Sequence, residues 1–388
     1  MASSAPSSGP PRQHALDGLR AVAAISVLVY HAWLYTLPTV SSGRKSTTSD
    51  YWWHELRLGL VLFFVLSGFL LYGAWVRSAM GDKPGPSVRG YAIRRAGRIL
   101  PAYWLAIAGS IALLWRSADT PGVRLPDAGN LWLFGVFGQN FNENTLLKLN
   151  PPSWTLAVEA TFYVLLPLAG VLAVKGRKVG VVLAPLVLLA VGVAYNYSLS
   201  DETGLSPIVS KVLPAYLPYF AVGMLAAVLA YDRRLRKPAT YALLGAGAVL
   251  VFGNAYWAGD AATRGSHDQA LRIWRDLPAA TGFALVLLAV AAATQAPRWL
   301  STKPMVKVGE LSYGIYLWHV PVMLFLRAQE LLPLFTTGAV AVALPVTLLV
   351  AGASWRWVER PAQDASRRIA ARGSARRAQR LETAAARA

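Results

Sequence analysis

The side chains best suited to chemistry begin with one stretch, LDGLRAVAAISVLVYH, which runs from Leu16 to His31. It places Arg20 and His31 eleven residues apart, a spacing that returns almost to the same face of an α-helix. The stretch is largely apolar after Asp17 and Arg20, and titratable groups inside apolar helices usually mark function. One helical face therefore carries a fixed cation and a group able to transfer protons.

A second group of polar residues follows the sequence NPPS, where the prolines end any preceding helix and a hydroxyl residue can cap a new one. Glu159 and Tyr163 are four residues apart in the predicted helix and share a face, with Thr155 one turn earlier. A carboxylate in an apolar helix needs a partner. A structural ion pair is the alternative role for Glu159.

Two further polar side chains lie deep in apolar stretches, Ser67 in LGLVLFFVLSGFLLYGAW and His319 in GELSYGIYLWHVPVMLFLR. If Arg20 marks the inner interface, a rise of about 1.5 Å per residue places His31 about 16 Å into a hydrocarbon core of about 30 Å. The same arithmetic places four more polar side chains in this layer, those of Ser67, Glu159, Tyr163 and His319. A structural hydrogen-bonding role is an equal alternative for His319.

A basic connector, SVRGYAIRRAGRILPAYW, supplies arginines that we expect beside this layer. Arg95 and Arg98 are three residues apart and share a face, next to Arg94. Guanidinium groups bind phosphates in bidentate fashion. The pattern indicates a buried chamber with His31 as base, Glu159 as the carboxylate that holds or charges it, and arginines for a phosphate-rich ligand such as acyl-CoA. Simple positive-inside charges are the alternative for the arginines.

The apolar residues gather in blocks of about twenty, in a chain of 388 residues that is 55% hydrophobic and 15% charged. Such blocks indicate repeated membrane-spanning helices. We predict an all-α, polytopic integral membrane protein with ten transmembrane helices and a short re-entrant or interfacial helix near 129–141. The predicted spans are 16–37, 57–78, 98–116, 153–174, 178–196, 211–231, 240–258, 277–295, 311–328 and 338–358.

The cations behind the net charge of +19 lie mainly in alternate connectors, a pattern that argues for membrane topology and against nucleic-acid binding. The positive-inside rule and the even span count place both termini in the cytoplasm of a bacterial-type cell. We expect a disordered cytoplasmic tail at 1–14, a membrane domain at 15–360 and a basic cytoplasmic tail at 361–388. The absence of cysteine excludes disulfides, thiolate metal sites and a cysteine-bound acyl intermediate, and we predict no metal site.

These motifs resemble the integral-membrane acyltransferases called acyltransferase family 3, and the resemblance runs from about Leu16 to Pro361. It rests on LDGLRAVAAISVLVYH, FFVLSGFL, RAGR, TLAVEATFY and GELSYGIYLWH, in this order. The resemblance implies ten core helices, transfer of an acyl group from a cytoplasmic acyl-CoA, and commonly a sugar hydroxyl as acceptor.

Carried onto this sequence, the resemblance makes His31 the catalytic histidine and Arg20 its supporting cation. Arg95 and Arg98 of the RAGR motif, together with the adjacent Arg94, become acyl-CoA contacts. Glu159 and Tyr163 belong to a family motif written Ser-Leu-x-x-Glu-x-x-x-Tyr, whose first position here is Thr155. A hydroxyl is retained there, although a role that needs a primary alcohol would be lost.

The leading hypothesis is an O-acyltransferase of the plasma membrane that takes acetyl-CoA or another short-chain acyl-CoA as donor substrate and holds no permanent cofactor. The expected acceptor is a hydroxylated glycan or a glycosylated small molecule, because the chain is similar in length to acyltransferases that modify macrolides. The sequence specifies no oligomeric state. The rival hypothesis is a transporter for a glycoconjugate or antibiotic, in which the same polar groups line a pathway.

Overall fold

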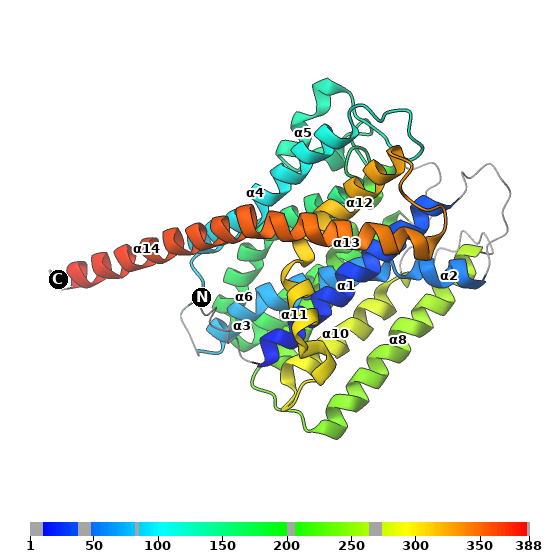
Figure 1. Ribbon diagram of the computed structural model, residues 1–388. Helices are drawn as coiled ribbons and strands as arrows, with labels where there is room; N and C mark the ends of the chain where they lie inside the picture. Colours follow the sequence, from blue (N-terminus) through cyan, green and yellow to red (C-terminus); the bar gives the residue numbers. More distant parts are fainter. Residues whose placement is uncertain (1–10, 38–47, 82–84, 200–205, 264–273, 386–388) are drawn as a thin grey trace, which may run out of the picture.

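The computed structural model of the protein describes residues 11–37, 48–81, 85–199, 206–263 and 274–385. Within these residues the chain is helical, and an isolated bridge between Leu235 and Ala293 is the only extended pairing. The predicted all-α architecture is therefore confirmed. Figure 1 shows the helices gathered into one body, from which the C-terminal helix projects.

Five helices position the candidate site. They are α1 (Pro11–Thr36), α3 (Leu58–Ala79), α4 (Val88–Leu114), α6 (Ser153–Ser198) and α12 (Ser312–Ala328). The other longer elements surround or extend this group. They are α2 (Thr48–Glu55), α7 (Leu213–Ala230), α8 (Lys237–Thr263), α10 (Leu277–Ala292), α11 (Lys303–Glu310), α13 (Thr336–Ser354), the π-helical turn η6 (Trp355–Glu359) and α14 (Arg360–Ala385).

Seven helical segments of the described chain are long and apolar enough to cross a membrane by length and composition. They are His14–Thr36, Trp52–Ala79, Val88–Leu114, Ser153–Ser198, Pro207–Ala230, Lys237–Ala258 and Thr336–Gly373. One of them, α6, contains two predicted spans, 153–174 and 178–196, separated by a break at Arg177, where φ is 52°. The multi-pass membrane architecture is thus confirmed, and the count of ten spans stays a prediction.

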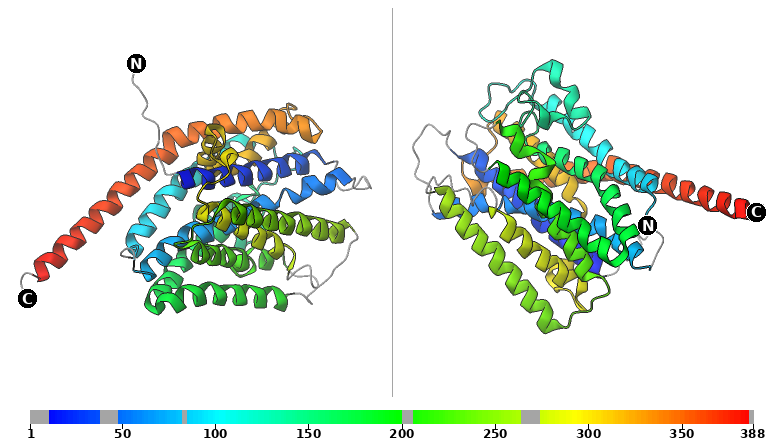
Figure 2. Two further views of the ribbon diagram at one scale, coloured as in Figure 1. Left: turned by 90° about the horizontal axis from the view of Figure 1, so that it is seen from below. Right: turned by 180° about the vertical axis from the view of Figure 1, so that it is seen from behind.

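Three boundaries differ from the sequence prediction. Helix α1 begins at Pro11, within the predicted N-terminal tail, whose first ten residues lie outside the described part. Helix α4 begins ten residues before the predicted span because the side chain of Ser87 accepts a hydrogen bond from the Gly90 N–H at 3.1 Å and caps the first turn. The basic segment after residue 360 is the helix α14, which leaves the body in both views of Figure 2.

The segment predicted as one short helix near 129–141 contains three single turns instead: η2 (Ala128–Asn130), α5 (Trp132–Gly135) and η3 (Gln139–Phe141). Its side chains reach the start of α6. Gln139 donates to the Ser153 carbonyl at 3.0 Å, and Asn140 donates to the Trp154 carbonyl at 2.8 Å. These two bonds connect the 139–141 turn to the first turn of α6, which carries Thr155.

Glycines allow α3 and α7 to pack backbone to backbone beside the site. A Cβ atom at Gly68 would overlap the carbonyl oxygen of Phe220, and one at Gly223 would overlap the carbonyl oxygen of Val65. Close approach through small residues is a general means of packing helices in membranes. These two contacts set the distance between α3, which carries Ser67, and its neighbour.

We expect the substitution Gly68→Ala to lower stability by about 1–3 kcal/mol, because the backbone of α7 must move to admit the methyl group. Gly73→Ala on the same helix is the matched control, since its nearest neighbour would be the Arg77 side chain at 3.7 Å. Thermal unfolding of the detergent-solubilised protein measures both. A midpoint for Gly68→Ala equal to that of Gly73→Ala would contradict the tight contact.

Candidate active site

A cavity lies among the five helices that position the candidate site. It brings together residues from predicted motifs that are far apart in the chain. The predicted site residues that line it are Arg20, Ser67, Arg95, Arg98, Thr155, Glu159 and Tyr163. Ser312, Tyr313 and Tyr316 of α12 complete its polar lining. The remaining predicted residues, Asp17, His31, Arg94 and His319, do not line this cavity.

Three cations contribute to the cavity wall near the beginnings of α1 and α4. Arg20 donates through Nη1 to Asp17 Oδ1 at 3.1 Å, so the predicted Asp17 acts on the cavity through this arginine. The guanidinium carbon of Arg95 lies 5.8 Å from the centre of the Tyr163 ring, and Arg98 follows one turn later. Arg94, in contrast, is exposed. The cavity therefore has a cationic wall that suits a polyanionic ligand.

The carboxylate of Glu159 is paired with Ser67, and not with a histidine. The Ser67 hydroxyl donates to Glu159 Oε1, which joins α3 to α6 within the cavity wall. No hydrogen bond joins Glu159 to His31 in the described chain. The sequence analysis expected this carboxylate to hold or charge His31, but α6 turns Glu159 toward α3, so the pair does not form.

Thr155 and Tyr316 form the next polar layer of the cavity. Thr155 Oγ1 lies 2.5 Å from the Tyr316 hydroxyl, and the two oxygens lie 3.1 and 3.0 Å from the Pro152 carbonyl oxygen. Both side chains are buried. This contact joins α6 to α12, and it gives the hydroxyl at position 155 a structural partner.

His31 is paired with His319, and the backbone determines where the protons lie. His319 Nδ1 is 3.0 Å from the Ile315 carbonyl oxygen and 2.8 Å from that of Tyr316. A carbonyl can only accept, so Nδ1 of His319 carries the proton and its Nε2 holds a lone pair. His31 Nδ1 lies 2.9 Å from the Val27 carbonyl oxygen and 3.1 Å from His319 Nε2, so it donates as well. In the neutral pair, Nε2 of His31 is therefore the free base.

Tyr316 belongs both to the cavity wall and to the surroundings of the histidine pair. The Tyr316 ring lies 5.7 Å from the ring of His319, while the Tyr316 side chain lines the cavity. The ring of His31 is 4.8 Å from that of His319. The histidine pair thus lies next to one side chain of the cavity wall, with Arg20 nearer the start of α1.

Comparison with known proteins identifies the family of this chain. A family model described as an acyltransferase domain matches residues 13–356, nearly the whole chain. The chain belongs to this acyltransferase family. The matched range contains every residue of the cavity and both histidines of the pair. The family assignment thus covers the complete candidate site.

Two relatives show how far the similarity extends. Nodulation protein 10 of Rhizobium leguminosarum bv. viciae is 26% identical, with 94% of this chain and 98% of the relative covered. The O-acetyltransferase OatA of Staphylococcus aureus is 22% identical, with 89% of this chain and 56% of the relative covered. This chain thus spans about half the length of its staphylococcal relatives. No solved structure matches it.

Tyr316 is the main residue of the candidate site that the predicted set of site residues did not include. It is three residues before His319 and therefore lies on the same helical face, the only sequence signal that could have identified it. Ser312, one turn before Tyr316, extends this face along the cavity.

We expect His319→Phe to lower kcat about 100-fold, because His31 loses one of the two acceptors that hold its Nδ1–H and with it the contact that orients its ring across helices. The phenyl ring retains most of the volume at a side chain that is only 1% exposed. Steady-state kinetics with variation of each substrate give kcat and both KM values. An unchanged kcat in a stable His319→Phe protein would reduce His319 to a packing residue.

Proposed function

We propose that this membrane protein is an acyl-CoA-dependent O-acyltransferase of a bacterial plasma membrane, with both termini in the cytoplasm. The observation that supports it best is the cavity with three arginines in its wall, together with the neighbouring histidine pair, in which His31 has a free Nε2. Family membership supports acyl transfer, and the similarity to staphylococcal proteins named as O-acetyltransferases supports transfer of an acetyl group to oxygen.

The arginines favour acyl-CoA as donor. Its phosphates can pair with Arg95, Arg98 and Arg20, since guanidinium groups bind phosphate oxygens in bidentate fashion. The pantetheine arm is uncharged and slender, and it suits a cavity whose remaining wall is largely apolar. Acetyl-CoA is the proposed donor, with no resident cofactor.

The reaction transfers the acyl group from sulfur to oxygen. Nε2 of His31 accepts the hydroxyl proton of the acceptor as its oxygen attacks the thioester carbonyl, the carbon–sulfur bond breaks, and the CoA thiolate takes up a proton. The free Nε2 can also attack the carbonyl first and carry the acyl group before the acceptor takes it. Rapid-quench kinetics without acceptor separate the two routes, because only the second produces a burst of CoA equal to the enzyme concentration.

The proposed acceptor is a hydroxyl of a glycan or of a glycosylated natural product such as a macrolide. Support comes from the resemblance noted in the sequence. A neutral imidazole base suits an alcohol, which is a weak acid and must lose its proton as it attacks.

The test uses the purified chain in liposomes with radiolabelled acetyl-CoA and a panel of methyl glycosides and glycosylated macrolides. We expect labelled ester to form with at least one acceptor and to require His31. Substrate flux across the liposome membrane without acyl-CoA, together with the absence of any labelled ester, would overturn the proposal in favour of a transporter.

A further inference from the structure

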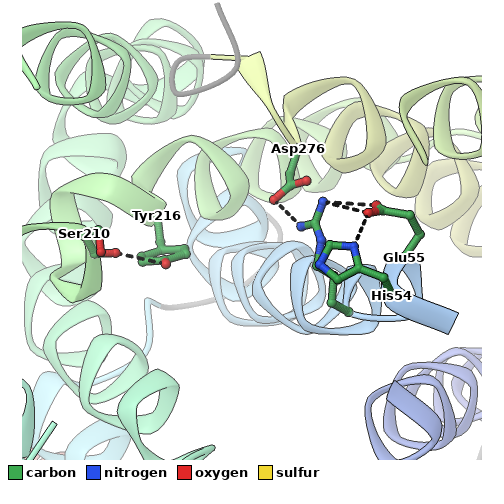
Figure 3. A network of polar contacts seen from close by, with 6 residues as sticks. His54, Glu55, Ser210, Tyr216 and Asp276 are labelled. Atoms are coloured by element: carbon green, nitrogen blue, oxygen red, sulfur yellow. Dashed lines mark hydrogen bonds and ion pairs between the residues drawn. The ribbon is translucent and has the colours of Figure 1, made fainter. Parts of the chain in front are cut away.

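A second polar network lies around the junction of α2 and α3, outside the cavity described above. His54 Nδ1 is 2.7 Å from Glu55 Oε1, and Arg57 donates through Nη2 to Glu55 Oε2 at 3.0 Å. Arg57 also donates through Nη1 to Asp276 Oδ2 at 2.8 Å, which joins α3 to the beginning of α10. Figure 3 shows His54, Glu55 and Asp276 converging in this way.

Arg57 lies between two carboxylates of this network, those of Glu55 and Asp276. Burial alone would raise the pKa of the Asp276 carboxyl, but the Arg57 guanidinium outweighs it and holds that pKa below its usual value. Asp276 is buried, and its Oδ1 makes no hydrogen bond within the described residues. Arg57 is thus fixed between two carboxylates.

His54 presents a defined hydrogen-bond acceptor. A carboxylate can only accept, so the contact with Glu55 places the proton on Nδ1 of His54 and leaves the lone pair on Nε2. The His54 side chain is 29% exposed, so a ligand can reach it, whereas the Glu55 side chain is 3% exposed. The dyad is therefore suited to accept a hydrogen bond from a hydroxyl group.

One aromatic ring connects this dyad to the histidine pair. The Tyr30 ring lies 6.0 Å from the His54 ring and 4.9 Å from the His31 ring. The Trp33 ring lies 5.8 Å from that of His54. Arg20, in contrast, precedes Tyr30 by ten residues, or about 15 Å along the helix. His54 therefore approaches His31 from a different end of α1 than the arginines do.

We propose that the His54–Glu55 dyad binds a hydroxyl group of a polyhydroxylated acceptor, such as a sugar, beside His31. The assignment rests on the proposed acyltransferase function and specifies where its acceptor binds. A few fixed polar groups among aromatic rings are the usual composition of a small-molecule site. Here Tyr30 and Trp33 supply the rings, His54 the acceptor nitrogen, and Glu55 the group that fixes its tautomer.

The test compares His54→Phe with the wild type, using acetyl-CoA and the methyl glycoside that the wild type acetylates fastest. Phenylalanine retains the ring but removes Nε2, so we expect KM for the glycoside to rise about tenfold while KM for acetyl-CoA stays within twofold. Tyr216→Phe is the matched control, since it removes a hydroxyl that bonds to the Ser210 carbonyl nearby (Figure 3) and leaves the dyad intact.

His54→Gln is the second variant, because its amide can donate to Glu55 and still accept from a hydroxyl. We expect its glycoside KM to lie within about threefold of the wild type, which a role in packing alone would not produce. Equal changes of both KM values in His54→Phe, or no change in either, would overturn the assignment. If the wild type itself forms no ester, the acyltransferase proposal fails and this assignment fails with it. If the wild type forms ester but His54→Phe gives either of the two results above, this assignment alone fails.

Discussion

Replacing His31 with alanine is expected to lower kcat by about 10³–10⁴-fold, the largest single effect we predict. His31 holds its proton on Nδ1, between the Val27 carbonyl and His319, and offers Nε2 as the base or nucleophile. Removing such a group typically leaves only the contribution of substrate positioning. KM for acetyl-CoA should change little, because the arginines of the cavity wall remain in place.

His14→Ala is the matched control for this experiment. His14 is on the same helix, α1, about five turns before His31 and outside the cavity lining. Both variants are compared with the wild type by thermal unfolding in detergent and by initial rates with labelled acetyl-CoA. Substantial turnover by folded His31→Ala would show that the proton or acyl group passes through another residue.

The double substitution Arg95→Ala and Arg98→Ala is expected to raise KM for acetyl-CoA roughly 100-fold, while KM for the acceptor changes less than twofold. Both guanidinium groups line the cavity, and hydrogen bonds between charged groups contribute about 1.5–3 kcal/mol each. Their loss should therefore weaken donor binding much more than it alters the reacting groups.

Arg94→Ala is the control for the arginine experiment, because Arg94 directly precedes Arg95 in the sequence. Its side chain is exposed and does not line the cavity, so removing it lowers the net charge without changing the cavity wall. Donor titrations at two salt concentrations compare the variants. If Arg94→Ala raises donor KM as much as the double variant does, the arginines act through general charge, and phosphate recognition by the cavity is refuted.

Local spacing was sufficient to predict which residues share a face of one helix. The eleven-residue interval from Arg20 to His31 and the four-residue interval from Glu159 to Tyr163 are properties of α-helical geometry, so they could be read without any tertiary information. The lengths of the apolar stretches likewise identified a multi-pass helical protein. Two of the predicted spans correspond to shorter helices in the structure, since α10 has 16 residues and α12 has 17.

The hydrogen-bond partners of these side chains on other helices could not be predicted in the same way. Glu159 accepts from Ser67, 92 positions away, and His31 pairs with His319, 288 positions away. Depth arithmetic placed all four in one membrane layer, but it could not say which faced which. That depends on how each helix is rotated about its axis, and the rotation is set by contacts such as the close packing of Gly68 on Phe220.

The sequence alone thus determined the class of fold, the helical faces that carry charge, and a family resemblance that the comparison with known proteins confirmed. Only the tertiary structure decided that Arg95 lines the cavity while Arg94 is exposed, and that a second histidine, not a carboxylate, holds His31. The physical reason is that helix formation depends on neighbours a few residues apart, whereas pairing between helices depends on packing over the whole chain.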